Sequence, residues 1–332
     1  MSRNLPSVHN RDTPPQIAAT PTPDQIAARL AEYDRLADGA FADNTRKAVK
    51  SDTALFAQWC ADNGHASGPP AYPETVAAFV DAMAVDLISG TDRARAPATI
   101  ARYVSSIDHL QRAAGVLPVG KSVQVSLALR RLRRSKGTAQ KQATPMRWSA
   151  VAGALGKLGG TLPELRDAAL IALAYDTLAR ASELVGFQVK DIAPAADGWG
   201  VAYIARSKTD QDGAGMYRPL TPDTLARVRA WVEAARLDAE SPLFIPLGNR
   251  AIKDALTPDE VSRIYKRRVG VGFSAHSTRV GNAVEQNENG VPLPQIMQSG
   301  GWKSPSMIGR YTKETDAMRG GSAALARLQG RA

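Results

Sequence analysis

The segment LPELRDAALIALAYDTLAR, residues 162–180, is apolar on nearly every side when it is read at helical spacing. A helix of this kind has no polar face to turn toward water, so other elements must surround it. We therefore expect residues 162–180 to form a central buried helix around which a whole domain is built.

Five amphipathic segments precede this helix. In each of them apolar residues recur at a spacing of three or four, as Ile100, Val104 and Ile107 do. Asn44 or Thr45 is expected to cap the second helix. The five predicted helices are residues 23–37, 44–64, 72–90, 96–115 and 122–137, and together they predict a helical bundle over residues 23–134.

The remaining segments define the domain organisation. Residues 1–22 are rich in Pro and Thr and are expected to be a loose tail, and the polar, aperiodic residues 135–146 are expected to be a linker. Beyond the linker we expect a helix over 149–158, the buried helix, two strands over 198–208 and 216–222 around a turn, and further helices. The predicted fold class is mainly α, with a mostly helical second domain (147–332) that contains a small antiparallel sheet.

The charge of the chain favours an anionic partner. Of 332 residues, 42 are Lys or Arg and 32 are Asp or Glu, a formal excess of ten positive charges. Nucleic acid is the first candidate and a membrane surface the second. No long apolar run or signal-peptide core is visible, so we expect a cytoplasmic protein without a membrane partner. The single cysteine, Cys60, excludes a disulfide framework and a cysteine-based metal cluster.

One set of side chains in the second domain is suited to an anionic transition state. Most of its members are hydrogen-bond donors, and the tyrosine is the obvious nucleophile. His276 and Arg279 share a helix face, with Ser274 as a possible cap, and the start of a helix favours an anion. In chain order the set is Arg180, Lys208, His276, Arg279, Trp302 and Tyr311. It fits phosphoryl transfer to a tyrosine hydroxyl with no metal and no other cofactor.

Each member also has an ordinary structural explanation. Arg180 and Glu183, three residues apart on one expected helix face, could simply pair with each other at the surface. Lys208 could be a solvated lysine of a hairpin, and His276 a histidine whose hydrogen bonds are satisfied internally. Trp302 and Tyr311 could be packing residues, with Ser304 and Pro305 starting the helix of Tyr311. Taken singly, these residues leave both explanations open.

Taken in order, the motifs resemble the tyrosine recombinase (phage integrase) family. The resemblance is strongest in HSTRVGNAVEQNENGVPLPQIMQSGGWKSPSMIGRYTK (276–313), and it is clear in LAYDTLARASELVGFQVKDI (173–192) and ARSKT (205–209). It extends over most of the chain from about residue 24. Most members of the wider family have a second histidine where this chain has Trp302, and a tryptophan there is typical of the subgroup that this chain resembles most.

The resemblance implies a mechanism and a role for each residue. Tyr311 would attack a DNA phosphodiester and form a 3′-phosphotyrosyl link, while Arg180 and Arg279 grip the non-bridging oxygens. His276 and Trp302 would donate hydrogen bonds to the same oxygens, Lys208 would protonate the departing 5′ oxygen, and Glu183 would support the site's framework. Neither ATP nor a metal would be needed.

The resemblance also implies DNA contacts and an assembly. A core-binding, SAM-like N-terminal domain and the catalytic domain would clamp duplex DNA at an inverted-repeat site. The expected contacts come from Arg102, which could read a base or bind a phosphate, and from two basic groups. These are Arg46, Lys47 and Lys50 on the second helix, and Arg130, Arg131, Arg133 and Arg134 near the linker. The C-terminal segment would dock into a neighbouring subunit of a homotetramer.

Two other classes of function share these features. A type IB topoisomerase or a telomere-resolving enzyme would use the same chemistry, and a non-catalytic DNA-binding protein could keep the fold alone. The sequence does not specify the target site, its spacer, the order of strand exchange or any accessory factor. It also does not distinguish a role in plasmid resolution from one in phage integration or transposon resolution.

Overall fold

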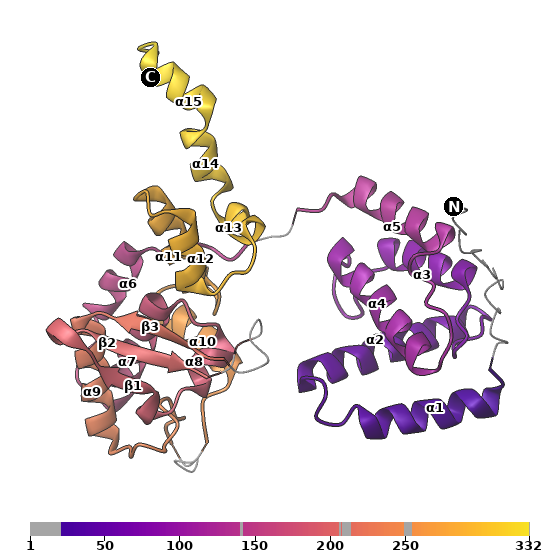
Figure 1. Ribbon diagram of the computed structural model, residues 1–332, viewed down its shortest axis with the longest axis horizontal. Coiled ribbons are helices and arrows are strands. Elements are labelled where there is room, and N and C mark those ends of the chain that lie inside the picture. The colour runs from indigo at the N-terminus through magenta and orange to yellow at the C-terminus, as the bar shows by residue number, and fades with distance from the viewer. Residues whose placement is uncertain (1–20, 140–141, 206, 208–213, 249–253, 332) are drawn as a thin grey trace, which may run out of the picture. The chain divides into compact units, whose positions relative to one another are not determined.

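The computed structural model describes residues 21–139, 142–205, 207, 214–248 and 254–331 (Figure 1). The chain divides into two compact units, Met1–Gln140 and Lys141–Ala332. Residues 1–20 of the predicted tail lie outside the described residues. Thr22, the last residue assigned to the tail, instead forms a capping box with Gln25 at the start of the first helix.

The first unit contains the five helices that the sequence predicts. They are α1 (Pro23–Leu36), α2 (Asp43–Asp62), α3 (Pro73–Val85), α4 (Pro97–Ala113) and α5 (Val123–Lys136). Helix α2 packs against α4 and α3 against α5. Their core is built around Phe56, Phe79, Ile100 and Leu132, all nearly or fully buried.

Two details of this unit differ from the prediction. Helix α2 begins at Asp43, and its N-cap, Ala42, makes no side-chain cap, so neither Asn44 nor Thr45 is the capping residue. Helix α3 ends at Val85 and not near residue 90. Beyond it Leu87 pairs with Ala94 in an isolated antiparallel bridge, which replaces the last predicted turn of helix.

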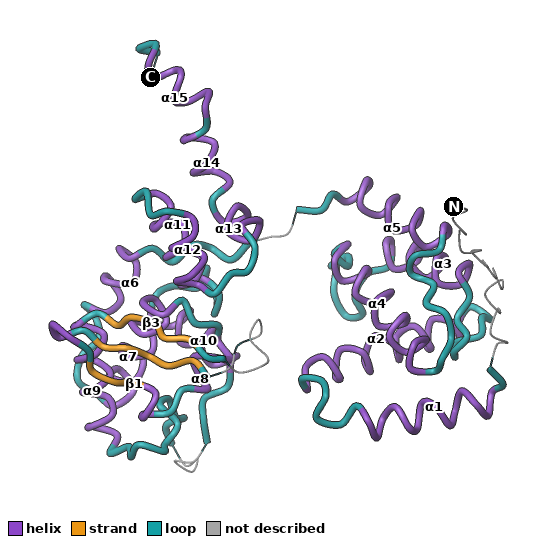
Figure 2. Tube along the Cα trace, viewed as in Figure 1, coloured by secondary structure: helices purple, strands orange, loops and turns teal. Residues whose placement is uncertain are grey.

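The second unit is also mostly helical (Figure 2). Its first helices are α6 (Trp148–Leu155), α7 (Leu162–Thr177) and α8 (Ala181–Gly186). Two single turns of 3-10 helix, Val189–Asp191 and Ala196–Gly198, flank the first strand. The later helices are α9 (Pro222–Ala235), α10 (Pro258–Arg268), α11 (Ser277–Glu288), α12 (Leu293–Gly300), α13 (Pro305–Tyr311), α14 (Lys313–Arg319) and α15 (Gly321–Leu328).

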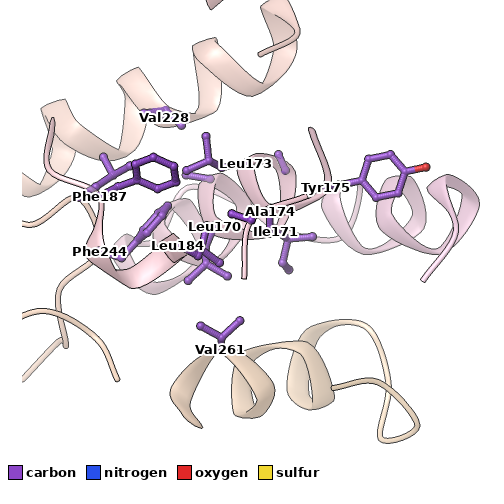
Figure 3. Packing of buried hydrophobic residues seen from close by; sticks show 14 of the residues in the cluster. Leu170, Ile171, Leu173, Ala174, Tyr175, Leu184, Phe187, Val228, Phe244 and Val261 are labelled. Atoms are coloured by element: carbon purple, nitrogen blue, oxygen red, sulfur yellow. The ribbon is translucent and has the colours of Figure 1, made fainter. Parts of the chain in front are cut away.

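Helix α7 is the central buried helix that the apolar segment predicts. From Arg166 to Tyr175 every residue is buried. Side chains of α7 such as Leu170 and Leu173 pack among Phe187, Val228 and Phe244, which come from three other segments (Figure 3). The core of the second unit is therefore built around α7. Packing on all sides fixes the position of the carboxyl end of this helix.

The sheet has three antiparallel strands in the order β1 (Ile192–Pro194), β2 (Gly200–Ile204) and β3 (Met216–Leu220). The predicted strand pair corresponds to β2 and β3, and Ala202 lies opposite Arg218 in their register. Sequence analysis missed β1, which is only three residues long and ends in a proline. Residues 206 and 208–213 of the predicted strand and turn lie outside the described residues.

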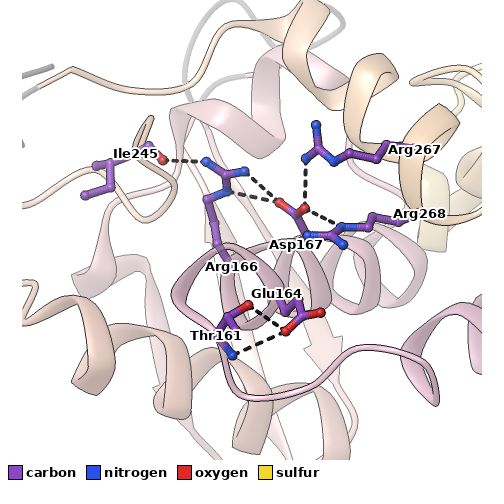
Figure 4. Close-up of polar contacts among 7 residues, drawn as sticks. All are labelled: Thr161, Glu164, Arg166, Asp167, Ile245, Arg267 and Arg268. Atoms are coloured by element: carbon purple, nitrogen blue, oxygen red, sulfur yellow. Dashed lines mark hydrogen bonds and ion pairs between the residues drawn. The ribbon is translucent and has the colours of Figure 1, made fainter. Parts of the chain in front are cut away.

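One carboxylate joins α7 to α10. Asp167 has no exposed surface and accepts hydrogen bonds from Arg166, Arg267 and Arg268, at 2.7, 2.9 and 2.8 Å for the closest atom of each (Figure 4). Burial alone would raise the pKa of the Asp167 carboxyl, but the three guanidiniums outweigh burial and hold this pKa below its ordinary value. The cluster thus stabilises the fold above the ordinary carboxyl pKa, and this contribution is lost as the pH falls through the lowered value.

The backbone of Met146, near the start of the second unit, packs against α11. The Met146 N–H donates to the Ser277 carbonyl at 2.9 Å, and the Met146 backbone lies against Gly281. A Cβ placed at Gly281 would be 1.9 Å from the Met146 carbonyl oxygen, so only glycine fits there. Helix α11, which contains Arg279 and has His276 as its N-cap, therefore packs directly against the backbone of Met146.

Replacing Asp167 by alanine is expected to destabilise the protein by about 3–5 kcal/mol, because it leaves Arg166 buried without its carboxylate. The free energy of unfolding, from urea denaturation followed by circular dichroism, measures the effect.

The matched control is Asp223→Ala, which removes an exposed ion pair with Arg227 on α9. A surface substitution of this kind changes stability by roughly 0.5 kcal/mol or less. Equal losses in the two variants would contradict the stabilising role of the buried cluster.

Candidate active site

A break after α7 positions the first predicted site residues. Leu178 has a left-handed backbone (φ 51°), and the chain then turns into α8. Arg180 is the N-cap of α8 and Glu183 is its third residue, so the two do not share the face of one helix as the sequence suggested. Glu183 accepts hydrogen bonds from both the backbone N–H (2.8 Å) and the guanidinium (2.6 Å) of Arg180. The two residues are paired, but Glu183 is almost buried and this pair is no surface ion pair.

Among the described residues of the site, Arg279 is the most deeply buried charge, with 2% of its surface exposed. Its guanidinium donates to the carbonyl of Leu178 and, at 2.5 Å, to the carbonyl of Gly300. These carbonyls stand at the carboxyl ends of α7 and α12, where helix dipoles favour a positive charge. Arg279 is thus held by backbone oxygens.

Trp302 covers Arg279. The guanidinium carbon lies 4.3 Å from the centroid of the indole ring, a cation–π contact. Trp302 belongs to a small apolar cluster with Leu178, Ile296 and Ile308, against which Tyr311 is also packed. This cluster ties the ends of α7, α12 and α13 together, so the packing role considered for Trp302 is real and places its ring at the site.

Tyr311 and His276 meet directly. The tyrosine hydroxyl lies 2.9 Å from Nε2 of His276, and the Tyr311 ring is 6.0 Å from that of Trp302. Tyr311 is the last residue of α13, whose N-cap is Ser304 as predicted. Because all these residues belong to one unit, a single chain brings the phenol, the imidazole and Arg279 together.

Burial and two neighbouring arginines determine the charge state of His276. Burial, together with the positive charges of Arg279 and Arg180, lowers the pKa of His276 to about 4. Burial, followed by the charge of Arg180, also lowers the pKa of Arg279 to about 10. At neutral pH the imidazole is therefore uncharged and Arg279 remains a cation.

The prediction for Ser274 is wrong, and the prediction for Lys208 is not tested. Ser274 does not cap α11, because His276 occupies the N-cap position and the Ser274 N–H donates to the Ser277 hydroxyl instead. Lys208 lies outside the described residues.

The predicted DNA-contacting residues are exposed side chains of the first unit. Three of them are held by carboxylates: Arg46 by Asp38 at 2.9 Å, Arg102 by the buried Asp52 at 2.6 Å and Arg131 by Asp81 at 2.6 Å. The others expected to bind DNA, all exposed, are Lys47, Lys50, Arg130, Arg133 and Arg134.

Sequence analysis missed two features of the site. The carbonyls of Leu178 and Gly300 have no side-chain signature, so no motif could have identified them. Arg218 on β3 is 5% exposed and interacts electrostatically with Glu183, Arg180 and Arg279. Its signal was available, because strand alternation puts Arg218 on the same face as the buried Leu220.

Within the described ranges, no three His, Cys, Asp or Glu side chains are grouped so that they could hold a metal ion. In the same part of the chain, no helix has the length and apolar character needed to cross a membrane.

Comparison with known proteins identifies the family. The model of the phage integrase family matches residues 158–318. The integrase/recombinase xerD homolog of Selenomonas ruminantium is 31% identical over 295 residues, which cover 82% of each protein. The chain belongs to the phage integrase family. Recombinase cre of Escherichia phage P1 is 27% identical, over 96% of this chain and 96% of that protein.

Membership makes the chain a tyrosine site-specific recombinase, an enzyme that acts on DNA. Two solved structures share its fold at 13% sequence identity. The Tn1549 transposon integrase in complex with a circular intermediate DNA aligns with a TM-score of 0.58, over 86% of this chain and 94% of that one. XerH recombinase bound to a palindromic difH substrate aligns with a TM-score of 0.51, over 90% and 95%. At this identity the structures support the fold alone.

The charge state of His276 is testable without DNA. Its pKa, followed by NMR titration of the imidazole, is expected near 4 in the wild type. In Arg180→Gln this pKa should rise, because one repelling charge is gone, but it should stay below 6.5 because burial remains. Between about 4 and 6.5 the unfolded chain binds more protons than the folded one, so stability should fall as the pH drops through this window.

His276 keeps part of its surface exposed, and solvent screening reduces the size of this loss of stability. The control is Arg227→Gln, which changes an arginine of α9 that pairs with Asp223 and should leave the His276 pKa unchanged. A His276 pKa that stayed constant in Arg180→Gln would show that the arginine has no part in it.

Proposed function

We propose that this recombinase cleaves and rejoins DNA through a covalent link between Tyr311 and a 3′ phosphate. The observation that carries the proposal is the contact of 2.9 Å between the Tyr311 hydroxyl and His276 Nε2, beside the buried guanidinium of Arg279. A nucleophile, a group able to take its proton and fixed positive charge are the three requirements of this chemistry.

In the cleavage step the Tyr311 oxygen attacks phosphorus, and the bond from phosphorus to the 5′ oxygen breaks. The neutral imidazole of His276 accepts the phenolic proton, and the departing 5′ oxygen takes a proton from Lys208, as the family resemblance implies. In the reverse step a 5′ hydroxyl from a partner strand gives its proton to Lys208 and attacks the phosphotyrosine. The bond from phosphorus to the tyrosine oxygen breaks, and Tyr311 takes back its proton from His276. The number of ester bonds is conserved, so no ATP is needed.

The arginines supply the electrostatic part of catalysis. Arg180 and Arg279 each have guanidinium nitrogens to offer the non-bridging oxygens of the phosphate, and Trp302 offers its indole N–H. Fixed donors of this kind act on the charge that develops in the transition state, and removing one typically lowers the rate by roughly 100- to 1000-fold. Glu183 orients Arg180 through two hydrogen bonds.

The N-terminal unit would supply most of the DNA contacts outside the cleavage site. Arg102 supports this proposal, because Asp52 accepts a hydrogen bond from it and another from Ser106 (2.8 Å) and so fixes one guanidinium nitrogen. A side chain fixed before binding loses less entropy when it contacts a base or a phosphate. The exposed arginines of α5 would contact phosphates.

Assembly into a tetramer on two inverted-repeat sites is supported by the C-terminal helices. Helix α14 is fastened to α11, since the Asn287 side chain donates to Asp316 at 3.0 Å and Arg319 donates to the backbone of α11. Helix α15 has no buried residue, and its Leu325 and Leu328 are 50% and 86% exposed. Among the described residues α15 contacts α14 but leaves these leucines uncovered, which fits docking into a neighbouring subunit.

Two other functions would use the same fold. A type IB topoisomerase would relax supercoiled DNA without exchanging sites, and a telomere-resolving enzyme would make hairpin ends from one site. A non-catalytic DNA-binding protein would form no covalent adduct. The contact between Tyr311 and His276 favours an enzyme, and a reaction with two copies of the site distinguishes the enzymes by their products.

The first experiment locates the target site. The purified enzyme is incubated with DNA of its own replicon, the mixture is denatured, and DNA that remains attached to protein is sequenced. Attachment at one recurrent position, through the 3′ end, supports the proposal. A set of random positions would favour the topoisomerase.

Tyr311→Phe is expected to abolish the covalent adduct and to leave DNA binding unchanged, because only the attacking oxygen is removed. Adducts are measured on denaturing gels and affinity by fluorescence anisotropy with the recovered site. Tyr217→Phe is the matched control, since Tyr217 is an exposed tyrosine of β3. Adduct formation by Tyr311→Phe would refute the assignment of the nucleophile.

Deletion of residues 322–332 is expected to preserve binding to a single site and to prevent the pairing of two sites, because it removes nearly all of α15. Native gels separate the two complexes. Deletion of residues 331 and 332 alone leaves α15 intact and serves as the control. Normal recombination by the longer deletion would exclude docking through α15.

A further inference from the structure

Arg218 is a buried cation that the mechanism above does not use. It lies in the middle of β3, where Tyr217 and Pro219 point outward and Arg218 and Leu220 point into the unit. A buried guanidinium is costly unless its environment compensates the charge. Its position next to the site suggests that it has a specific task.

The contacts of Arg218 connect β3 to the carboxyl end of α12. One terminal nitrogen donates to the Gln298 carbonyl, and the other lies 2.8 Å from the sulfur of Met216. Its Nε is buried and has no hydrogen-bond partner among the described residues. Arg218 is therefore held chiefly by a carbonyl two residues before the one that Arg279 uses.

The two arginines bind carbonyls two residues apart in one short turn. Arg279 donates to Gly300 and Arg218 to Gln298, and the chain between them leads into Trp302. A Cβ at Gly300 would be 2.0 Å from the Trp302 ring. Gly301 has a φ of +63°, and a Cβ there would be 2.9 Å from the Arg218 guanidinium. The turn is thus closely packed between the indole and Arg218.

This turn determines where the indole lies. Trp302 follows it immediately, and from there the ring reaches both the Arg279 guanidinium and the Tyr311 ring. A shift of residues 298–301 would move the indole relative to both. Since Arg218 joins the turn to β3, it makes the position of Trp302 depend on the sheet.

We propose that Arg218 is a positioning residue for DNA cleavage, which holds the turn 298–301 so that Trp302 stays over Arg279 and against Tyr311. The link to cleavage rests on the proposed function. The positioning of the indole does not.

The first test needs no DNA. The indole N–H resonance of Trp302 is identified by its disappearance from the NMR spectrum in Trp302→Phe. In Arg218→Met, which keeps an unbranched apolar stem but removes the guanidinium and its donors, this resonance is expected to shift. The resonances of Trp59, Trp148, Trp199 and Trp231 should stay in place. An unshifted Trp302 resonance in a folded Arg218→Met protein would overturn the proposal.

The second test measures single-turnover cleavage at the site recovered by covalent trapping. Arg218→Met is expected to lower the cleavage rate by about 10- to 100-fold. This is the range typical for the loss of a residue that acts by orienting another, as measured for residues that orient metal ligands. Its affinity for the site should not change. Arg218→Lys, which can still donate to Gln298, should recover much of the rate and also serves if Arg218→Met does not fold.

A double variant shows whether Arg218 acts through the indole. If it does, Arg218→Met should cost much less in a Trp302→Ala background than in the wild type, because the effects of residues acting as a unit do not add. Equal fold losses in the two backgrounds would overturn the proposal. The control is Arg166→Met, which removes another buried arginine bound to a backbone carbonyl, that of Ile245, and should leave the cleavage rate unchanged.

The outcomes separate the two proposals. If the wild type forms no adduct on any DNA, the proposed function fails while the resonance of Trp302 still tests the positioning. If the wild type cleaves and Arg218→Met cleaves equally fast, the function stands and the role of Arg218 is refuted.

Discussion

The site depends on a cation that is held by helix ends. Arg279 is buried with its hydrogen bonds directed at the carbonyls of Leu178 and Gly300, which close α7 and α12. Moving a guanidinium out of water costs several kcal/mol unless strong acceptors replace the water. The carbonyls at a helix end are such acceptors, because no N–H of the helix uses them and they carry its negative partial charge. The position of α7 in the core therefore fixes where Arg279 lies.

The other residues of the site follow from this arrangement. The left-handed backbone at Leu178 that frees its carbonyl also turns the chain into α8, and Arg180 caps that helix. The turn that presents Gly300 leads directly to Trp302. The small apolar cluster around Trp302 joins this turn to α13, and the Tyr311 hydroxyl therefore lies within reach of His276. One packing arrangement thus brings together residues that are up to 131 positions apart in the chain, from Arg180 to Tyr311.

The sequence predicted the large-scale features well because they rest on periodicity. The apolar segment predicted α7, the amphipathic patterns predicted α1 to α5, and Ser304 with Pro305 predicted the start of α13. Local backbone geometry was harder to predict. Ser274 and Asn44 have the right side chains for caps, but His276 and Ala42 occupy those positions because tertiary packing decides where each helix begins. Backbone acceptors such as the Leu178 carbonyl have no sequence signal. The alternation of inward and outward side chains along β3 does predict that Arg218 points inward, but the sequence analysis did not apply it to this residue.

The choice of carbonyls over carboxylates as partners of Arg279 has a further consequence. A carboxylate would have neutralised the guanidinium and would have to be displaced by any incoming phosphate. Backbone oxygens leave the full charge of Arg279 in place, and within the described residues Glu183 is the carboxylate that acts on Arg180, Arg218 and Arg279 together. The site is thus a region of mutual repulsion among guanidiniums, which a bound anion would relieve. Under the proposed mechanism, the energy of that relief would help to hold the phosphate before any bond changes.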